Sequence, residues 1–179
     1  MTVPSMACGH ETMEIRLHGL ARESITDGPG FRYAIFTQGC PHQCEGCHNQ
    51  ASHSFTDGTV VSVDLLSAEF LSNPMLDGIT LSGGEPFMQA AECALLASRA
   101  RAAGLHVMLY SGYTFEEILE QAIYRAGWAD LLSQADILID GRYEKSLRSL
   151  ELRFRGSRNQ RAIDVPASLA AGKAILADL

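Results

Sequence analysis

Three cysteines lie within eight positions of the chain, in the segment GCPHQCEGCHNQ at residues 39–50. Their spacing, Cys40-x-x-x-Cys44-x-x-Cys47, puts three thiolates on one short loop. Three thiolates are enough to hold three irons of a [4Fe-4S] cubane and to leave the fourth iron without a protein ligand. Because an open iron can bind a substrate, the spacing predicts a cluster that takes part in chemistry.

A structural zinc site is the main alternative for these cysteines. Zinc needs a fourth ligand, which His42, His48 or His53 could supply. Zinc ligands usually come as two separated pairs, whereas these cysteines form one group. The spacing therefore favours the cluster and leaves zinc open.

A second motif, Ser82-Gly83-Gly84-Glu85-Pro86, follows the apolar segment GITL. Paired glycines let the backbone approach a ligand closely, and their amides offer hydrogen bonds. The Glu85 carboxylate can meet a cationic amino group. Alone, a double glycine after a strand more often marks a tight turn. In combination with the cysteines it indicates a binding site.

The elements that must position these motifs alternate along the chain. Strand-forming residues predict strands at 13–20, 32–37, 79–81, 105–110 and 137–139. Apolar residues at helical spacing predict helices at 63–71, 87–103 and 114–126, the last capped by Thr114 and Glu117. This alternation predicts right-handed βαβ crossovers and a mainly parallel sheet. The fold class is α/β, and the units are too few for a closed eight-stranded barrel, so we expect an open, partial βα barrel.

The motifs follow predicted strands. In parallel sheets, ligands collect at the carboxyl ends of the strands. The cysteine segment, the Ser82–Pro86 motif and the Ser111-Gly112-Tyr113 turn each come directly after one. We therefore expect all three to share one rim.

Composition narrows the functional classes. With 179 residues we expect a loose extension at 1–12 and a single domain at 13–179. The net charge of -7 argues against a nucleic-acid partner, because such proteins carry basic patches. The lack of a long apolar stretch or a secretory leader predicts a cytoplasmic protein without a membrane partner. An odd number of cysteines, five, favours metal ligation over a disulfide framework.

Other cysteines and a basic run have ordinary interpretations. Cys93 reads as a buried small hydrophobe, and Cys8 with His10 as incidental. The basic run is either a solvated face or a surface for an acidic partner or a phosphate. Its members are Arg142, Lys145, Arg148, Arg153, Arg155, Arg158 and Arg161.

Several segments resemble a known superfamily. The cysteine spacing followed by LSGGEP is similar to the signature of radical S-adenosylmethionine enzymes. DGPGFRYAIFTQGCPHQCEGCHN, LSGGEPF, YSGYTFEEI, DILIDGRY and RGSRNQ resemble the activating enzymes of glycyl-radical enzymes, above all those of anaerobic (class III) ribonucleoside-triphosphate reductases. The similarity runs from about Ile25 to Ile163. Many superfamily members have an aromatic residue where this chain has Gly46, a choice similar to the short reductase activators.

The resemblance implies a radical S-adenosylmethionine domain and assigns its residues. Cys40, Cys44 and Cys47 would ligate the cluster, and the methionyl amine and carboxylate of S-adenosylmethionine would chelate the open iron. The implied cofactor-binding residues are Gly46, His48 and Asn49 near the nucleoside or the cluster, Ser82, Gly83, Gly84 and Glu85 near the methionyl amino group, and Ser111.

The implied activity is the reductive cleavage of S-adenosylmethionine to a 5′-deoxyadenosyl radical, which takes a hydrogen from a glycine of the partner reductase. A flavodoxin or ferredoxin is the expected electron donor. Three rivals remain. They are an activator of a different glycyl-radical enzyme, a small-molecule radical enzyme similar to 7-carboxy-7-deazaguanine synthase, and a zinc or iron-sulfur binding module.

Overall fold

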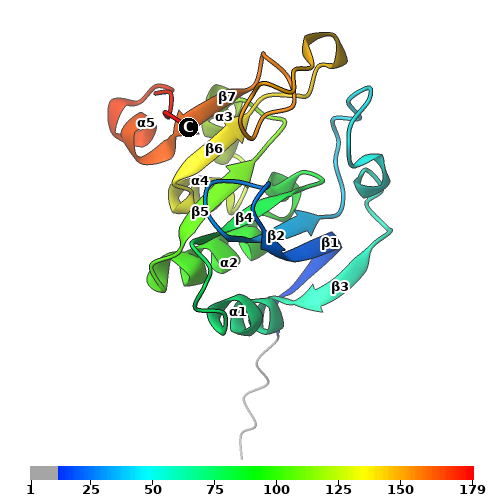
Figure 1. Ribbon diagram of the computed structural model, residues 1–179, viewed down its shortest axis with the longest axis vertical. Helices are drawn as coiled ribbons and strands as arrows, with labels where there is room; N and C mark the ends of the chain where they lie inside the picture. The colour runs from blue at the N-terminus through cyan, green and yellow to red at the C-terminus, as the bar shows by residue number, and fades with distance from the viewer. Residues whose placement is uncertain (1–11) are drawn as a thin grey trace, which may run out of the picture.

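A computed structural model of the chain describes residues 12–179 (Figure 1). The predicted extension at 1–12, with Cys8 and His10, lies outside the described residues except for its last position. No helix in the described range is long and apolar enough to cross a membrane.

Within residues 12–179, one sheet of seven strands, in the order β3-β1-β2-β4-β5-β6-β7, organises the fold. The strands are β1 Glu14–Ser24, β2 Arg32–Thr37, β3 Thr59–Ser62, β4 Gly78–Gly83, β5 His106–Tyr110, β6 Ile137–Asp140 and β7 Arg161–Asp164. The four central strands, β2, β4, β5 and β6, run parallel, and the strands outside them pair antiparallel. The α/β class and the open sheet are thus confirmed, and the sheet is mixed at both edges.

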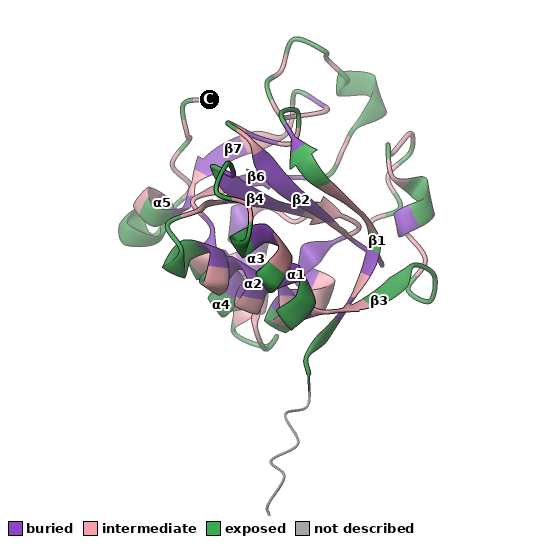
Figure 2. Cartoon of the chain, turned by 60° about the horizontal axis from the view of Figure 1, so that its bottom comes forward, coloured by how far each residue is buried: buried purple, intermediate pink, exposed green. Residues whose placement is uncertain are grey.

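Five α-helices in the described part of the chain connect and flank the strands. They are α1 Val63–Leu71, α2 Ala90–Ala102, α3 Phe115–Ala122, α4 Trp128–Gln134 and α5 Val165–Ala171. Figure 2 shows α1 to α4 together on one side of the sheet, where α2 packs against both α1 and α4. The predicted capping box of Thr114 and Glu117 is present at the start of α3.

Two predicted helix boundaries were wrong for local reasons. The helix predicted at 87–103 begins instead as a 3-10 turn, Pro86–Gln89, because the Glu85 side chain caps it through the Phe87 amide. The helix predicted at 114–126 ends at Ala122, and a separate helix, α4, starts after Gly127, whose φ of 80° is left-handed. Glycine adopts that backbone conformation without steric penalty.

The two faces of the sheet differ in what covers them. Alternate strand residues such as Tyr33, Ile79 and Leu109 point toward the helices and form the main apolar cluster. Cys93 is fully buried in the same cluster, as predicted. The other face, which we call the open face, carries loops instead of helices. Thr80 donates to the carbonyl of Asp27 in loop 25–31, and the Tyr110 hydroxyl donates to Phe154 in loop 141–160.

Candidate functional site

The loop that carries the three cysteines is fastened at its base. It leaves the end of β2, and the amides of Gly39 and Cys40 donate to the carbonyls of Ser52 and His53 at 2.8 and 3.1 Å. The buried side-chain amide of Gln38 adds bonds to two more carbonyls of the returning segment. The loop therefore closes on itself at the rim of the sheet while its tip stays partly exposed.

The cysteines are free thiols that line one cavity of about 140 Å³, which we call the cysteine cavity. Its lining brings together the three motifs that the sequence placed on one rim: Cys40, Cys44 and Cys47, Ser82, Gly83 and Gly84, and Ser111 and Gly112. The parallel order of β2, β4 and β5 is the reason, because it sets the carboxyl ends of these strands side by side.

Burial favours the neutral thiol at two of the cysteines when no ligand is bound. Burial raises the pKa of Cys40 to about 11, and burial also raises the pKa of Cys44. A metal that binds here must therefore displace the thiol protons. The backbone amide of Asn49 points at the Cys47 sulfur, with a distance of 3.4 Å between the nitrogen and the sulfur. Such an amide stabilises negative charge on a sulfur ligand.

Among residues 12–179, no three His, Cys, Asp or Glu side chains converge so that they could hold one ion. A mononuclear zinc site requires that convergence. The cysteines of a cubane, in contrast, each bind a different iron.

The paired glycines have a packing role that their sequence position did not reveal. A Cβ on Gly83, whose φ is 95°, would lie 2.6 Å from the backbone of Phe36, and one on Gly84 would lie 2.5 Å from the Gly39 carbonyl oxygen. The amides of Gly84 and Glu85 donate to Thr37 and Gly39 at 2.7 and 2.8 Å. The glycines thus let this turn dock directly against the start of the cysteine loop.

Glu85 lies behind the cysteine cavity and is fully buried. One carboxylate oxygen accepts from the Ser111 hydroxyl at 3.0 Å and the Phe87 amide at 3.2 Å. The other lies 2.9 Å from His42 Nε2 and accepts from the Gly112 amide at 2.8 Å. Sequence reasoning treated His42 only as a possible zinc ligand, and its place between two of the cysteines was the available signal.

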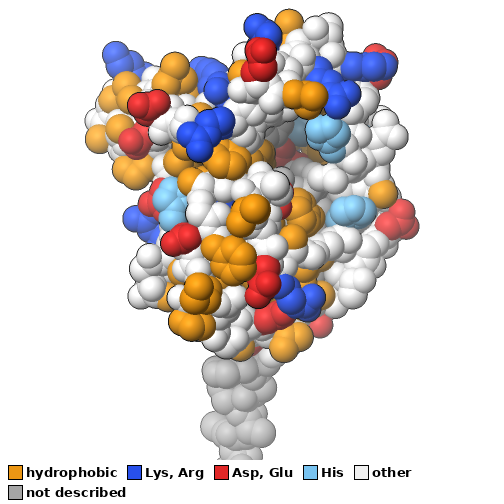
Figure 3. Space-filling view, in the orientation of Figure 1, with side chains coloured by type: hydrophobic (Ala, Val, Ile, Leu, Met, Phe, Trp, Pro, Cys, Tyr) orange, Lys and Arg blue, Asp and Glu red, His pale blue; other side chains and the backbone are white. Residues whose placement is uncertain are grey.

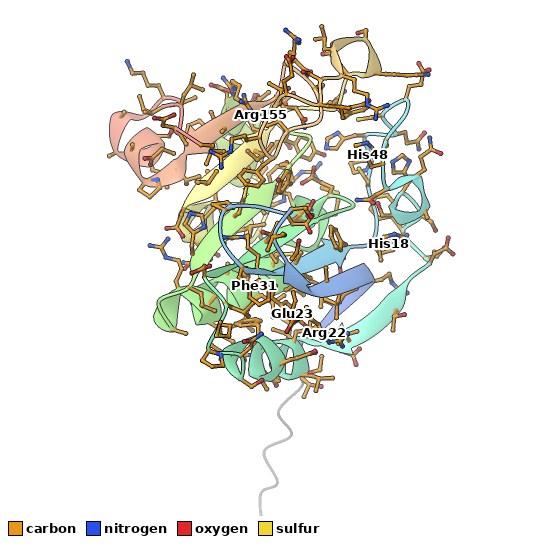
Figure 4. The ribbon with its side chains drawn as sticks, in the orientation of Figure 1. His18, Arg22, Glu23, Phe31, His48 and Arg155 are labelled. Carbon is orange, nitrogen blue, oxygen red and sulfur yellow. The ribbon has the colours of Figure 1, made fainter. Side chains whose placement is uncertain are left out.

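A larger cavity of about 500 Å³ adjoins the first and lies over the open face of the sheet; we call it the open-face cavity. Figure 3 shows the molecule hollowed here between the loops and the sheet, and Figure 4 labels His48 and Arg155 of its lining. The predicted residues Cys47, His48, Asn49 and Ser82 line it, together with residues that sequence reasoning did not assign to the cofactor: Asp27, Tyr110, Tyr143, Phe154, Arg155 and Gln160.

Gly46 lies against side chains of loop 141–160. A Cβ at Gly46 would lie 3.3 Å from Lys145 and 3.6 Å from Tyr143. Its φ of 74° is left-handed, so glycine also serves the tight turn before Cys47. The left-handed backbone and the close approach of Lys145 are local reasons for a glycine at this position.

Some members of the basic run form ion pairs, and one borders a cavity. Three of its members form ion pairs: Arg161 with Asp140 and Glu116, Lys145 with Glu45, and Arg158 with Glu151. Arg155 instead borders the open-face cavity and donates to the Gln160 carbonyl at 3.3 Å. Docking of an acidic partner on this run stays a prediction.

The chain is similar to proteins of known families. The family described as a 4Fe-4S single cluster domain matches residues 26–163. An anaerobic ribonucleoside-triphosphate reductase-activating protein from Enterobacteria phage T4 is 36% identical over 143 residues, which cover 76% of this chain and 86% of the relative. Proteins of the same name from Vibrio cholerae and Escherichia coli are 32% and 29% identical over 146 residues, covering 76% of this chain and 89% and 90% of theirs. The chain belongs to the family of anaerobic ribonucleoside-triphosphate reductase-activating proteins.

Proposed function

We propose that this chain holds a [4Fe-4S] cluster on Cys40, Cys44 and Cys47 and uses it to cleave S-adenosylmethionine and form a glycyl radical on an anaerobic ribonucleoside-triphosphate reductase. The observation that carries the proposal is the cysteine cavity, where three free thiols meet the Gly83-Gly84 turn. The relatives support the choice of partner, since they are named for activating that reductase. The matching 4Fe-4S single cluster domain supports the cluster.

The donor chemistry of the site fits such a cluster. Three thiols without disulfide partners are grouped on one loop, and the Asn49 amide already points at the sulfur of Cys47. Three cysteines for four irons leave one iron to S-adenosylmethionine. When bound, the cluster supplies the electron that splits S-adenosylmethionine into methionine and a 5′-deoxyadenosyl radical, which takes a hydrogen atom from the partner's glycine.

The residues of the chain bind, orient and shield the reactants. Ser82, Gly83 and Gly84 line the cysteine cavity and would hold the methionyl end of the cofactor. His48 and Asn49 line the open-face cavity and would lie beside the nucleoside. Loops 25–31 and 141–160 border that cavity and would keep water from a reactive radical. The open-face cavity, with a volume of about 500 Å³, also leaves room for a backbone loop of a protein substrate.

The proposal extends to fold type, electron source and compartment. An open sheet with four parallel central strands and helices on one face supports the partial βα barrel of radical S-adenosylmethionine enzymes. A flavodoxin or ferredoxin would deliver the electron. The cytoplasm is the compartment that we predict for this chemistry.

An anaerobic experiment tests the cleavage reaction. The chain is reconstituted with iron and sulfide, given a reductant and S-adenosylmethionine, and assayed for methionine and 5′-deoxyadenosine. We expect equal amounts of both products from the wild type and only background from Cys44→Ala. The matched control is Cys93→Ala, which removes a buried thiol of α2 and leaves the cysteine cavity untouched. It should keep both products.

Adding the partner tests the second half of the reaction. With the anaerobic reductase present, a glycyl radical signal in electron paramagnetic resonance should appear with the wild type and not with Cys44→Ala. Cleavage without any glycyl radical would favour a small-molecule radical enzyme or a different partner. Iron binding without cleavage, or a colourless zinc protein, would contradict the proposal and leave a binding module.

A further inference from the structure

Three motifs that are far apart in the sequence meet at the Glu85 carboxylate. His42 comes from the cysteine loop, and Ser111 and Gly112 come from the turn after β5. With the Phe87 amide they provide four hydrogen-bonding partners. An ionised carboxylate has about four acceptor positions. Glu85 is therefore saturated by the protein itself, with no exposed surface.

Of the four hydrogen bonds to the Glu85 carboxylate, the one with His42 joins it to the cysteine loop. An ionised Glu85 carboxylate can only accept hydrogen bonds, so in that form His42 Nε2 is the donor. The His42 and Glu85 side chains are 4% and 0% exposed, so solvent screens this contact weakly. The ring also packs edge-on against Tyr113, 4.4 Å between centroids, and Tyr113 packs in turn against Trp128 at 5.0 Å. His42 thus anchors the cysteine loop to the aromatic core.

The turn after β5 is shaped around this anchor. A Cβ on Gly112 would lie 2.3 Å from Cδ2 and 2.6 Å from Nε2 of His42, so a larger residue would displace the ring. Ser111 accepts from the Tyr113 amide and donates to Glu85, which fixes its hydroxyl. The contacts with His42 and Glu85 therefore account for the serine and the glycine at these positions without any contact to a ligand.

We infer that His42 and Glu85 are a pair of positioning residues, which hold the Cys40–Cys44 part of the cysteine loop against the glycine turn so that the two sides of the cofactor site keep one spacing. This inference rests on the proposed function. It differs from the expectation drawn from the sequence, in which the Glu85 carboxylate meets the methionyl amino group itself. Contact with that group falls instead to the backbone of the Gly83-Gly84 turn.

A first experiment measures how well the cysteine loop is protected from exchange with solvent, independently of the reaction. Hydrogen–deuterium exchange is followed in the full chain for segment 39–47 in His42→Ala, His42→Gln and the wild type. We expect faster exchange in His42→Ala, because the loop loses its side-chain anchor. His42→Gln keeps an amide donor close to the place of Nε2 and should restore protection. The control is His18→Ala, an exposed position on β1 that should leave this segment unchanged.

A second experiment separates cofactor binding from turnover. Groups that orient metal ligands from behind typically change affinity or activity by about 10- to 100-fold. We expect His42→Ala to bind iron, to raise the KM for S-adenosylmethionine by about that factor, and to weaken the change that S-adenosylmethionine causes in the electron paramagnetic resonance spectrum of the reduced cluster. His42→Gln should lie close to the wild type in both measurements.

The outcomes distinguish this inference from the proposed function. If the wild type forms both products and His42→Ala behaves like His18→Ala, the positioning role is wrong and the proposed function stands. Equal loss of iron in His42→Ala and His42→Gln would also overturn the positioning role. If the wild type forms neither product, the proposed function fails, and exchange in segment 39–47 still decides whether the pair holds the loop.

Discussion

On the helix-covered face of the sheet, Tyr33 and Ile79 from adjacent strands join one apolar cluster that also contains Leu96 of α2. On the open face, the same two strands present Arg32 and Thr80, both fully buried beneath loop 25–31. One face is held by apolar packing, which has no direction. The other carries only a small apolar cluster, on β5, β6 and β7, and its loops are placed by directed hydrogen bonds. The cavities border this second face, so the main apolar cluster and the site lie on opposite sides of the sheet.

Arg32 illustrates how hydrogen bonds on the open face fix the position of a loop. Its guanidinium donates to the Thr80 hydroxyl at 2.7 Å, to the Pro29 carbonyl at 3.0 Å, to the His106 carbonyl at 3.1 Å and to the carbonyl of Ile79. Burial lowers the pKa of Arg32 to about 10, so the side chain stays charged at neutral pH. One buried cation thereby ties loop 25–31 to two strands and places Asp27 at the edge of the open-face cavity.

The largest effect on stability is expected on the helix-covered face. Leu96→Ala leaves a cavity in the main cluster and should lower the free energy of unfolding by about 2–5 kcal/mol. The KM for S-adenosylmethionine should not change, because Leu96 lies in the main apolar cluster on the side of the sheet away from the open-face cavity. Denaturant unfolding and cleavage kinetics measure both quantities. Leu65→Ala on α1, where the side chain is 62% exposed, is the control. A changed KM in the folded Leu96 variant would show that the two faces are not separate.

A smaller loss of stability with a larger effect on the site is expected for Arg32→Met. The change leaves buried carbonyl groups without their donor, which should lower the free energy of unfolding by about 2 kcal/mol. Because loop 25–31 is released, the KM for S-adenosylmethionine should rise. Arg22→Met is the matched control, since Arg22 makes an exposed pair with Glu69 and such pairs contribute little. An unchanged KM in Arg32→Met would remove the functional half of the comparison.

Sequence patterns predicted the helix-covered face better than the open face. Segments 32–37 and 105–110 are short runs of strand-forming residues that need no partner to be recognised, and the structure has strands at both. The edge strands β3 and β7 have four residues each, and most of β3 is exposed or half-buried. Each of them pairs with a strand that is distant in the sequence, so no local pattern predicted them.

The sequence indicated which residues of the candidate site share a rim of the sheet. It could not indicate which of these residues form hydrogen bonds with one another. The order of parallel strands was enough to bring the cysteines, the glycine turn and Ser111 to one cavity. The role of Glu85 depends on His42, which lies 43 residues away, and on a turn 26 and 27 residues away. Such contacts are set by packing of whole elements, and only the fold displays them.

The smallest effect is expected at the sheet edge, where Arg161 of β7 binds Glu116 at the start of α3 at 2.6 Å. The hydrogen bond from Arg161 lowers the pKa of Glu116 below its ordinary 4.5. A lowered folded-state pKa adds stability above about pH 4.5, and this stability is lost as the pH falls through the folded value. Glu116→Gln should therefore flatten the acid limb of a stability curve measured from pH 7 to pH 3. Because Glu116 is 57% exposed, solvent screening should keep the difference at pH 7 below about 1 kcal/mol. Glu120→Gln, exposed on the same helix, is the control, and an equal flattening there would assign the effect to net charge instead of the pair.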